Sequence, residues 1–364
     1  MDTSNDGLRD RHPFHMHDAI RSQPEAFVRV VGRNQDPADG FAAEVASCKR
    51  LFLVGIGTSY HAARVGEYLL RSYGGGMPVQ AIHAFDFALY GPELTPEDCV
   101  VGVSHRGSKR YTALALGRAR EAGCRTALVA GEGASVDAPV GRVFPTVPQE
   151  RSAAHTVSYT GAGAVLSLLA GRVGYHRTGE TTLPEAVVEK EVPAALREAL
   201  GFEGAMENLA CDHRGRRRIW LAGGGPGAVV AEETALKIKE TSYLGAEGMP
   251  TETLLHGPFQ CVEAEDLFVL VAPTDVAQER TLEVLDLVQE IGGASVIVGD
   301  GVESSPGPAE VVGVPAVPAP FSALTCLVPL QLFAYYLALA RGTNPDSFRA
   351  EDPRFFRANV SGRL

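Results

Sequence analysis

The chain has 364 residues and a formal net charge of −11, with 45% hydrophobic and 21% charged residues. This length exceeds one typical domain, so we expect two domains of about 150 residues each, with extensions. The composition excludes a largely disordered chain, and the acidic balance argues against a broad nucleic-acid surface, which needs clustered Lys and Arg.

Cysteine usage and hydropathy predict a cytoplasmic protein. The six cysteines show no CxxC spacing, which predicts reduced thiols. The polar N-terminus and the lack of about twenty uninterrupted apolar residues predict neither a signal peptide nor a membrane partner. Three neighbouring histidines, at 12, 15 and 17, lack Cys or carboxylate partners at ligand spacing, so we expect no metal.

The first half of the chain reads as an alternation of strands and helices. A short amphipathic segment at 16–31, interrupted by Pro24, is not expected to join either core. The strand RLFLV at 50–54 then runs into a glycine turn, where Thr58 and Ser59 can cap a helix whose free N–H groups suit an anion. Further strands are predicted at 78–82, 99–103, 125–130 and 142–147. Such an order indicates a parallel sheet with helices on both faces and ligands at the carboxyl ends of its strands.

The second half repeats this order. RRIWLAGGGPGAVVAEETALKIKE at 217–240 parallels RLFLVGIGTSYHAARVGEYLLRS at 50–72, and two later strands follow at 266–273 and 294–300. An internal duplication explains both the length and the order of elements. The turn GGGPG does not fit a dinucleotide fingerprint, so no cofactor is expected.

One helix, from 231 to about 244, carries an unusual polar face. Glu233, Lys237 and Glu240 follow at steps of four and three, so their side chains can meet in one pocket. The glycines and the proline of 245–250 predict a loop, which leads to His256. The same pattern also fits a solvated helix with an ordinary surface pair, so the context must decide.

Several pieces of the chain resemble a known family. They are GIGTSYHAA, SHRGSKRYT, ETALKIKETSYLGAE and LLHGP, spread over residues 16–345. Together they resemble the double sugar isomerase (SIS) domain family, most closely the isomerase half of glucosamine-6-phosphate synthase. The resemblance implies an α/β fold of two tandem SIS domains, each a three-layer αβα sandwich with a flavodoxin-like, parallel, five-stranded sheet. We expect an N-terminal extension (1–34), a first domain (35–175), a linker and connecting helix (176–210), a second domain (211–343) and a tail (344–364).

The resemblance also implies roles for particular residues. It implies that Glu240 moves the proton between C1 and C2, that Lys237 positions the sugar, and that His256 serves ring opening from a neighbouring subunit, which predicts a homodimer with a shared active site. The substrate-binding positions that it implies are Gly57, Thr58, Ser59, Ser104, His105, Arg106, Ser108, Lys109, Ala153 and Glu233.

The chain departs from the family pattern in three places. No glutaminase domain is expected before the SIS pair, so ammonia is not expected from glutamine. The family has a sugar-contacting lysine in its C-terminal tail, but no lysine follows Lys239 in this chain. Arg349, Arg354 or Arg357 could contact the substrate as cations instead. The anion loop carries basic side chains in place of small hydroxyls, which fits a sulfonate, a bulkier phosphorylated conjugate, or cations that point to solvent or a partner.

These features predict an aldose–ketose isomerase or amino-sugar deaminase that acts on a phosphorylated hexose or amino sugar through an enediol or enediolamine. Such chemistry needs a base of near-neutral pKa, and a partly desolvated carboxylate such as Glu240 provides one. Isomerisation of a sulfosugar and deglycation of a fructosamine phosphate remain alternatives. A different class, a non-catalytic sugar-phosphate sensor, would have no need for the Glu, Lys and His set.

Overall fold

The computed structural model describes residues 9–136, 140–302 and 308–360. Two parallel five-stranded sheets form its framework. The first has the order β2-β1-β3-β4-β5 and the second β10-β9-β8-β6-β7. Read from the opposite edge, the second order is that of the first, which confirms the predicted duplication. The strands are β1 (Arg50–Gly55), β2 (Val79–His83), β3 (Asp98–Val103), β4 (Arg125–Glu132), β5 (Arg142–Pro148), β6 (Arg218–Gly223), β7 (Gly245–Pro250), β8 (Leu267–Val271), β9 (Ala294–Gly299) and β10 (Glu310–Gly313).

Helices cover both faces of each sheet, as predicted. Those of the first half are α1 (His15–Arg21), α2 (Gln23–Ala46), α3 (Thr58–Tyr73), α4 (Ala84–Tyr90), α5 (Arg110–Glu121) and α6 (Val157–Thr178). A π-helical turn (Val187–Glu191), α7 (Val192–Ala199), a 3-10 turn (Leu200–Phe202) and α8 (Glu203–His213) connect the halves. The second half contains α9 (Gly225–Ser242), α10 (Thr251–Leu255), α11 (Gln278–Leu282), α12 (Val284–Glu290), α13 (Ser322–Thr325), α14 (Leu327–Ala340), α15 (Pro353–Val360) and 3-10 turns at Pro258–Cys261 and Ala319–Phe321.

An ion pair between an arginine and a buried carboxylate recurs in both halves. Arg50 Nη2 lies 2.7 Å from Asp98 Oδ2, and Arg218 Nη2 lies 3.0 Å from Asp266 Oδ2. In each half the arginine opens the first strand in sequence, β1 or β6, and the carboxylate, which is at most 1% exposed, comes 48 residues later. The duplication therefore extends from the strand order to single side chains at the amino edge of each sheet.

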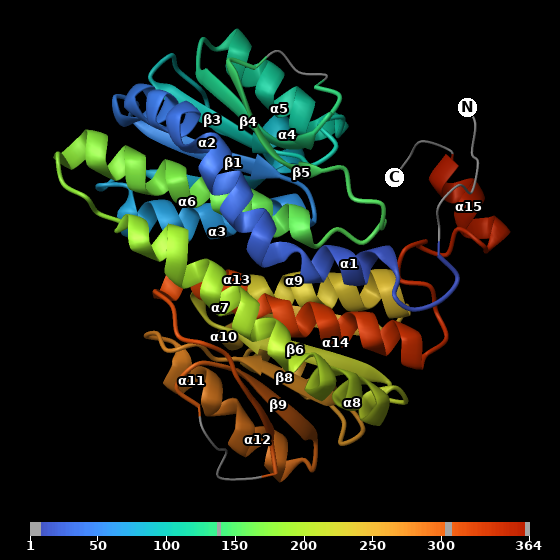
Figure 1. Cartoon of the computed structure of the whole chain (residues 1–364). Coiled ribbons are helices and arrows are strands. Elements are labelled where there is room, and N and C mark those ends of the chain that lie inside the picture. Colours follow the sequence, from blue (N-terminus) through green and yellow to red (C-terminus); the bar gives the residue numbers. More distant parts are fainter. Residues whose placement is uncertain (1–8, 137–139, 303–307, 361–364) are drawn as a thin grey trace.

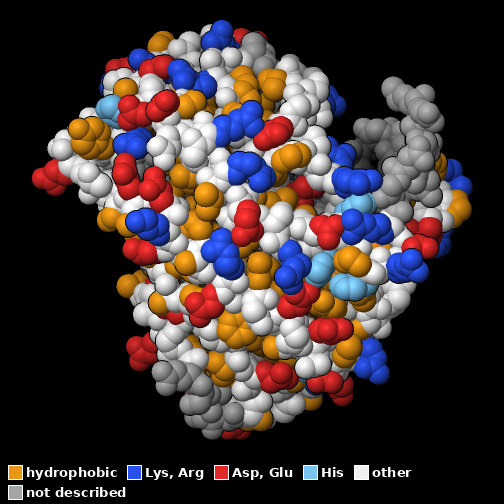
Figure 2. Space-filling view, in the orientation of Figure 1, with side chains coloured by type: hydrophobic (Ala, Val, Ile, Leu, Met, Phe, Trp, Pro, Cys, Tyr) orange, Lys and Arg blue, Asp and Glu red, His pale blue; other side chains and the backbone are white. Residues whose placement is uncertain are grey.

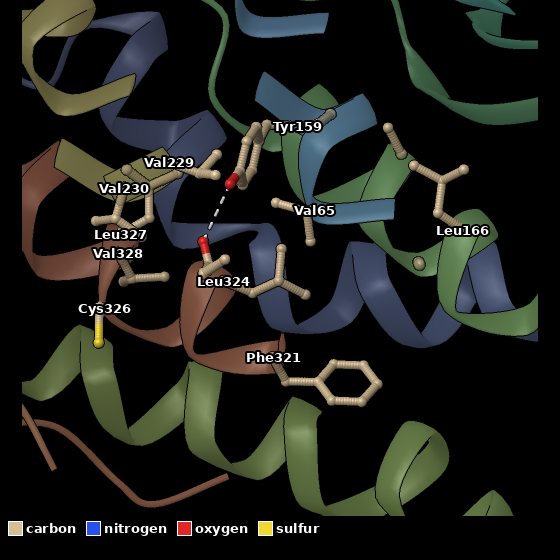
Figure 3. Close-up of a cluster of buried hydrophobic side chains, with 14 of the residues drawn as sticks. Val65, Tyr159, Leu166, Val229, Val230, Phe321, Leu324, Cys326, Leu327 and Val328 are labelled. Atoms are coloured by element: carbon tan, nitrogen blue, oxygen red, sulfur yellow. Dashed lines mark hydrogen bonds between the residues drawn. The ribbon is translucent and has the colours of Figure 1, made fainter. Parts of the chain in front are cut away.

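One continuous core joins the two halves. In Figure 1 the sheets lie toward opposite ends of the molecule, and α3, α6, α9 and α14 lie between them. The Tyr159 hydroxyl on α6 donates a hydrogen bond to the carbonyl of Ala323 on α13 at 3.2 Å. Figure 3 shows apolar side chains from both halves that meet there: Val65, Leu166, Val229, Val230, Phe321, Leu324, Leu327 and Val328.

Helix α14 is apolar on every side because it lies inside this core. An 18-residue window within Ala319–Ala340 has a mean hydropathy of 1.7, enough by length and composition for a membrane span, yet 89% of that window is buried in the protein. A helix that is hydrophobic all round and enclosed by protein is a core helix. On the outer surface, by contrast, basic side chains are interspersed with acidic ones over the face shown in Figure 2.

The prediction that residues 16–31 lie outside the cores is wrong. They form α1 and the start of α2, and Met16, Ile20 and Phe27 are fully buried in the joint core. Pro24 does not interrupt the helix because it occupies the first turn of α2, where a missing N–H costs nothing.

The predicted loop at 245–250 is also wrong, because these residues form the edge strand β7, which pairs with β6. Gly248 lies within this strand because a side chain does not fit there. A Cβ at this position would lie 2.3 Å from the carbonyl oxygen of Ala231. The glycine therefore allows β7 to lie directly against the backbone of α9.

Candidate active site

Helix α9 places Glu233, Lys237 and Glu240 on one face, and neighbouring helices bury that face. Lys237 Nζ lies 2.5 Å from Glu240 Oε2 and 3.4 Å from Glu233 Oε1. The Glu233 and Lys237 side chains are at most 1% exposed, whereas that of Glu240 is 22% exposed. The solvated-helix interpretation is therefore excluded, and Glu240 is the member of the set that a ligand can reach.

The electrostatics of this set favour one proton acceptor beside one fixed cation. Burial raises the pKa of Glu240, and the lysine ammonium offsets that effect only in part. Burial would also raise the pKa of Glu233, but Lys237, His61 and Thr58 outweigh it and lower the pKa. The pKa of Lys237 is raised because the two carboxylates outweigh its burial. Lys237 is therefore charged at neutral pH. Of the two carboxylic acids, Glu233 and Glu240, Glu240 is the weaker acid.

The first domain contributes directly to this set through α3. The Thr58 hydroxyl donates to Glu233 Oε1 at 2.9 Å, and His61 Nδ1 lies 2.5 Å from Glu233 Oε2. The turn before α3 is tight: a Cβ at Gly55 would lie 2.5 Å from the Ser59 carbonyl oxygen, and Gly57 has a φ of 56°. The Glu233 carboxylate, predicted to bind substrate, is thus occupied by protein groups and orients Lys237. Its substrate contact stays a prediction.

The loop after β3 lies at the carboxyl edge of the first sheet, as predicted. Ser104 is buried, and its hydroxyl has no hydrogen-bond partner within the described part of the chain. Arg106, Ser108 and Lys109 are exposed. The loop thus combines a buried free hydroxyl with cations that can reach over a ligand, an arrangement suited to an anion.

His105, predicted to bind substrate, instead joins two loops. Its imidazole is 6% exposed, and its Nε2 accepts a hydrogen bond from the Glu150 N–H at 3.0 Å. Its carbonyl accepts a second bond from the Gln149 side chain at 3.0 Å. Because a backbone N–H can only donate, His105 Nε2 carries no proton here, and burial lowers the pKa of the imidazole accordingly. A substrate contact for His105 stays a prediction.

The segment between β5 and α6 contacts the loop at 104–109 through the hydrogen bond between Glu150 and His105. The Glu150 carboxylate accepts hydrogen bonds from the N–H groups of Thr156 and Ser158, each at 2.9 Å, and so caps α6. Ala153, a predicted substrate contact, is partly exposed, and its N–H donates to the carbonyl of Asp346 in the C-terminal segment. The Ser152 hydroxyl is buried and lacks a partner among the described residues.

His155 and His61 are site residues that the sequence does not reveal. The His155 ring packs edge-on against His105 with centroids 4.9 Å apart, and its buried Nε2 lacks a partner in the described ranges. Burial, then repulsion from His105 and Lys237, lowers the pKa of His155 to about 2. Single histidines inside helical or loop sequence carry no periodic signal, so only their placement shows that they face the set on α9.

His256 and the tail arginines do not join this set within one chain. The His256 side chain is 76% exposed and pairs with Glu252 at 3.0 Å. Arg354 is 78% exposed and bonds Asp352, and the Arg349 guanidinium lies 4.1 Å from the centre of the Tyr243 ring. Ring opening by a neighbouring subunit's copy of His256, and a substrate contact for the arginines, stay predictions.

Fold and site together define a two-domain α/β protein in which a buried carboxylate, lysine and carboxylate set faces an anion-type loop across the domain boundary. A sequence model described as the SIS domain matches residues 44–171 and again 214–341. The chain therefore belongs to the SIS domain family, as the motifs predicted.

Curated relatives give the nearest biochemical context. The chain is 32% identical over 347 residues to glutamine–fructose-6-phosphate aminotransferase (isomerizing) of Caulobacter vibrioides, covering 92% of this chain and 57% of that protein. It is 34% identical over 356 residues to the protein of the same name from Aeropyrum pernix, covering 93% and 56%. The chain thus spans little more than half the length of these relatives.

Solved structures share the fold. The C-terminal domain of glucosamine-fructose-6-phosphate aminotransferase from Francisella tularensis matches with a TM-score of 0.83 at 23% identity, covering 94% of this chain and 99% of that one. Tagatose-6-phosphate ketose/aldose isomerase from Escherichia coli matches with a TM-score of 0.77 at 19% identity, covering 94% and 96%.

Proposed function

We propose that the chain is an aldose–ketose isomerase, or a closely related amino-sugar deaminase, that acts on a phosphorylated hexose or amino sugar. The observation that carries the proposal is the position of Glu240. It is the accessible end of a buried charged set, and its pKa is raised by burial. It lies on α9, where the neighbouring Glu233 accepts a hydrogen bond from Thr58 at the start of α3. The names of the relatives support this reaction class. They are isomerizing glutamine–fructose-6-phosphate aminotransferases and a tagatose-6-phosphate ketose/aldose isomerase.

The geometry supports a division of labour. Glu240, in its ionised form, takes the proton from the carbon beside the carbonyl and returns it to the neighbouring carbon. Lys237 is held in its charged form and stabilises the negative oxygen of the enediolate, while the hydroxyl proton of one carbon passes to the carbonyl oxygen of the other. The loops at 104–109 and 150–156 hold the anionic end of the sugar, so that the reacting carbons lie over Glu240. A homodimer that supplies His256 for ring opening completes the proposal.

Deuterium exchange tests the enolisation step. The purified chain is incubated in D2O with hexose 6-phosphates, glucosamine 6-phosphate, a fructosamine phosphate and 6-sulfo sugars. Deuterium is then measured by mass spectrometry at C2 of the aldoses and at C1 of the ketoses and the fructosamine. We expect exchange with at least one member of the panel. Isomerisation, deamination and deglycation all share the enolisation step, so exchange alone does not distinguish them. Identification of the products does.

The variant Glu240→Gln should still bind the sugar but lose exchange by at least about 100-fold, since the amide cannot act as a base. Glu247→Gln on the exposed edge strand β7 is the matched control and should leave exchange unchanged. Full exchange in Glu240→Gln would refute the assignment of the base. Tight binding by the unaltered chain without any exchange would instead indicate a sugar-phosphate sensor.

A further inference from the structure

His61 lies where the two domains meet, and two residues, Glu233 and Lys237, connect it to the candidate base. Its Nδ1 lies 2.5 Å from Glu233 Oε2, and the Glu233 carboxylate then lies 3.4 Å from Lys237 Nζ. Lys237 in turn bonds Glu240 at 2.5 Å. The contacts therefore run in one line from α3 of the first domain, through the buried face of α9, to the carboxylate that a ligand can reach.

The tautomer of His61 follows from its partner. Glu233 is ionised, because its pKa is lowered, and an ionised carboxylate only accepts hydrogen bonds. His61 Nδ1 therefore carries the hydrogen of this bond, in both the neutral and the charged form of the ring. The other nitrogen, Nε2, lies 3.7 Å from Glu232 Oε2, close enough for an ion pair when the ring is protonated. The ring can thus change its charge without losing its hold on Glu233.

We propose that His61 is a positioning residue of the active site, which holds Glu233 in register with Lys237 and sets, through its own protonation state, the net charge beside the Glu240 carboxylate. This inference rests on the proposed role of Glu240 as the base. It differs from that proposal because His61 does not touch the substrate and acts through Glu233 and Lys237.

The charges around the ring define what it can do. From α9 the ring faces Glu232 and Glu233, and from its own helix it faces Arg64, whose guanidinium pairs with Glu232. With neutral His61, the set formed by Glu233, Lys237 and Glu240 carries one net negative charge, and with protonated His61 this charge is cancelled. A positive ring makes Glu240 a weaker base, whereas the Glu233 carboxylate makes it a stronger one.

His61 also takes part in a structural connection between the two domains. Thr58 and His61 both belong to α3, and both bond the one Glu233 carboxylate on α9. Thr58 opens α3 directly after the glycine turn at 55–57. A shift of α9 would therefore be transmitted through Glu233 to the start of α3 and to this turn.

Two variants of His61 and one control separate these parts. Asn places an amide N–H near the position of Nδ1, so His61→Asn should keep the bond to Glu233 but cannot become charged. His61→Phe keeps the size and loses the bond. His176→Asn is the matched control, because His176 on α6 also pairs with a carboxylate, Asp39 at 3.0 Å, but lies away from the site.

The measurement is the pH profile of kcat/KM for the deuterium exchange reaction, whose acidic limb reports ionisation of the base. In His61→Asn the limb should move to higher pH by about half a unit, which costs roughly threefold in rate below the limb. The plateau should stay within about threefold of the unaltered chain. In His61→Phe the plateau itself should fall at least tenfold, since Glu233 loses its orientation. His176→Asn should superimpose on the unaltered chain.

Glu233→Gln supplies a test of the opposite sign, because removal of the repelling carboxylate should move the limb to lower pH. An acidic limb that stays in place in His61→Asn, or equal plateaus in His61→Asn and His61→Phe, would overturn the inference. The carboxyl 13C resonance of Glu240, identified by its loss in Glu240→Gln, gives the same titration without turnover. A chain without exchange activity would thus defeat the proposed function, while an unmoved 13C titration would defeat the role of His61 alone.

Discussion

Acid sensitivity of the fold should depend on His155. This ring is enclosed by the loops at 104–109 and 150–156, and its pKa is lowered from 6.5 to about 2 by burial, then by the neighbouring His105 and Lys237. A histidine with a lowered pKa in the folded state favours the neutral form. Its contribution to stability is therefore complete above pH 6.5 and is lost as the pH falls below that value, because the unfolded chain then binds a proton that the folded chain does not.

The size of the effect follows from these two pKa values. Each pH unit below 6.5 costs roughly 1.4 kcal/mol, so the unfolding free energy should fall by about 2 kcal/mol between pH 7.5 and pH 5.0 through His155 alone. The variant His155→Asn has no such titration. Its unfolding free energy should therefore decline by about 2 kcal/mol less over the same interval, whatever the substitution costs at pH 7.5.

Urea unfolding followed by circular dichroism at both pH values measures the unfolding free energy of each protein. The decline between pH 7.5 and pH 5.0 is then compared between the unaltered chain and the variant. Other histidines with lowered pKa, His105 and His213, remain in both proteins, so their contributions cancel. His256→Asn is the control, since that side chain is 76% exposed, and it should decline in parallel with the unaltered chain. Parallel declines for His155→Asn and the unaltered chain would refute the reasoning that His155 is held neutral in the fold.

Two further substitutions test the packing that positions the site. Gly248→Ala should destabilise the protein by about 1–3 kcal/mol in a thermal melt, because the new Cβ would lie 2.3 Å from the backbone oxygen of Ala231, whereas Gly245→Ala in the same strand meets open space and should change stability by less than about 0.5 kcal/mol. Equal melts for the two glycine variants would show that β7 can move away from α9. Asp346→Ala should cost about 1–3 kcal/mol and expose the N-terminal segment to protease, because its buried carboxylate accepts two N–H bonds, at 2.9 and 3.0 Å, from the first turn of α1. Unchanged protease resistance would mean that α1 is held by its apolar contacts alone.

Local sequence patterns were sufficient for most of the framework. The apolar runs at 50–54 and 99–103 became β1 and β3 within one residue at each end. Such short buried strands bounded by polar loops read clearly because both faces of the sheet are covered. Edge strand β7 was missed for the opposite reason: its sequence GAEGMP has little apolar content, and it pairs only with β6.

The N-terminal segment shows a second limit of sequence patterns. Residues 16–31 have an amphipathic pattern that fits either a peripheral helix or a core helix. In the structure, α2 packs against α6 and closes one face of the first sheet, so its apolar side belongs to the joint core. Pro24 does not break α2, contrary to the prediction. The free-energy cost of a proline depends on its position within the helix, and one residue alone does not reveal that position.

The spacing of Glu233, Lys237 and Glu240 places them on one face of a helix, because the 3.6-residue period depends only on local backbone geometry. Spacing does not show that this face is enclosed between α3 and the core, that Glu233 is bound by Thr58 and His61, or that His256 lies on the surface. Burial and electrostatic environment arise from residues far apart in the chain, and these nonlocal contacts raise the pKa of Glu240 and hold Lys237 in its charged form.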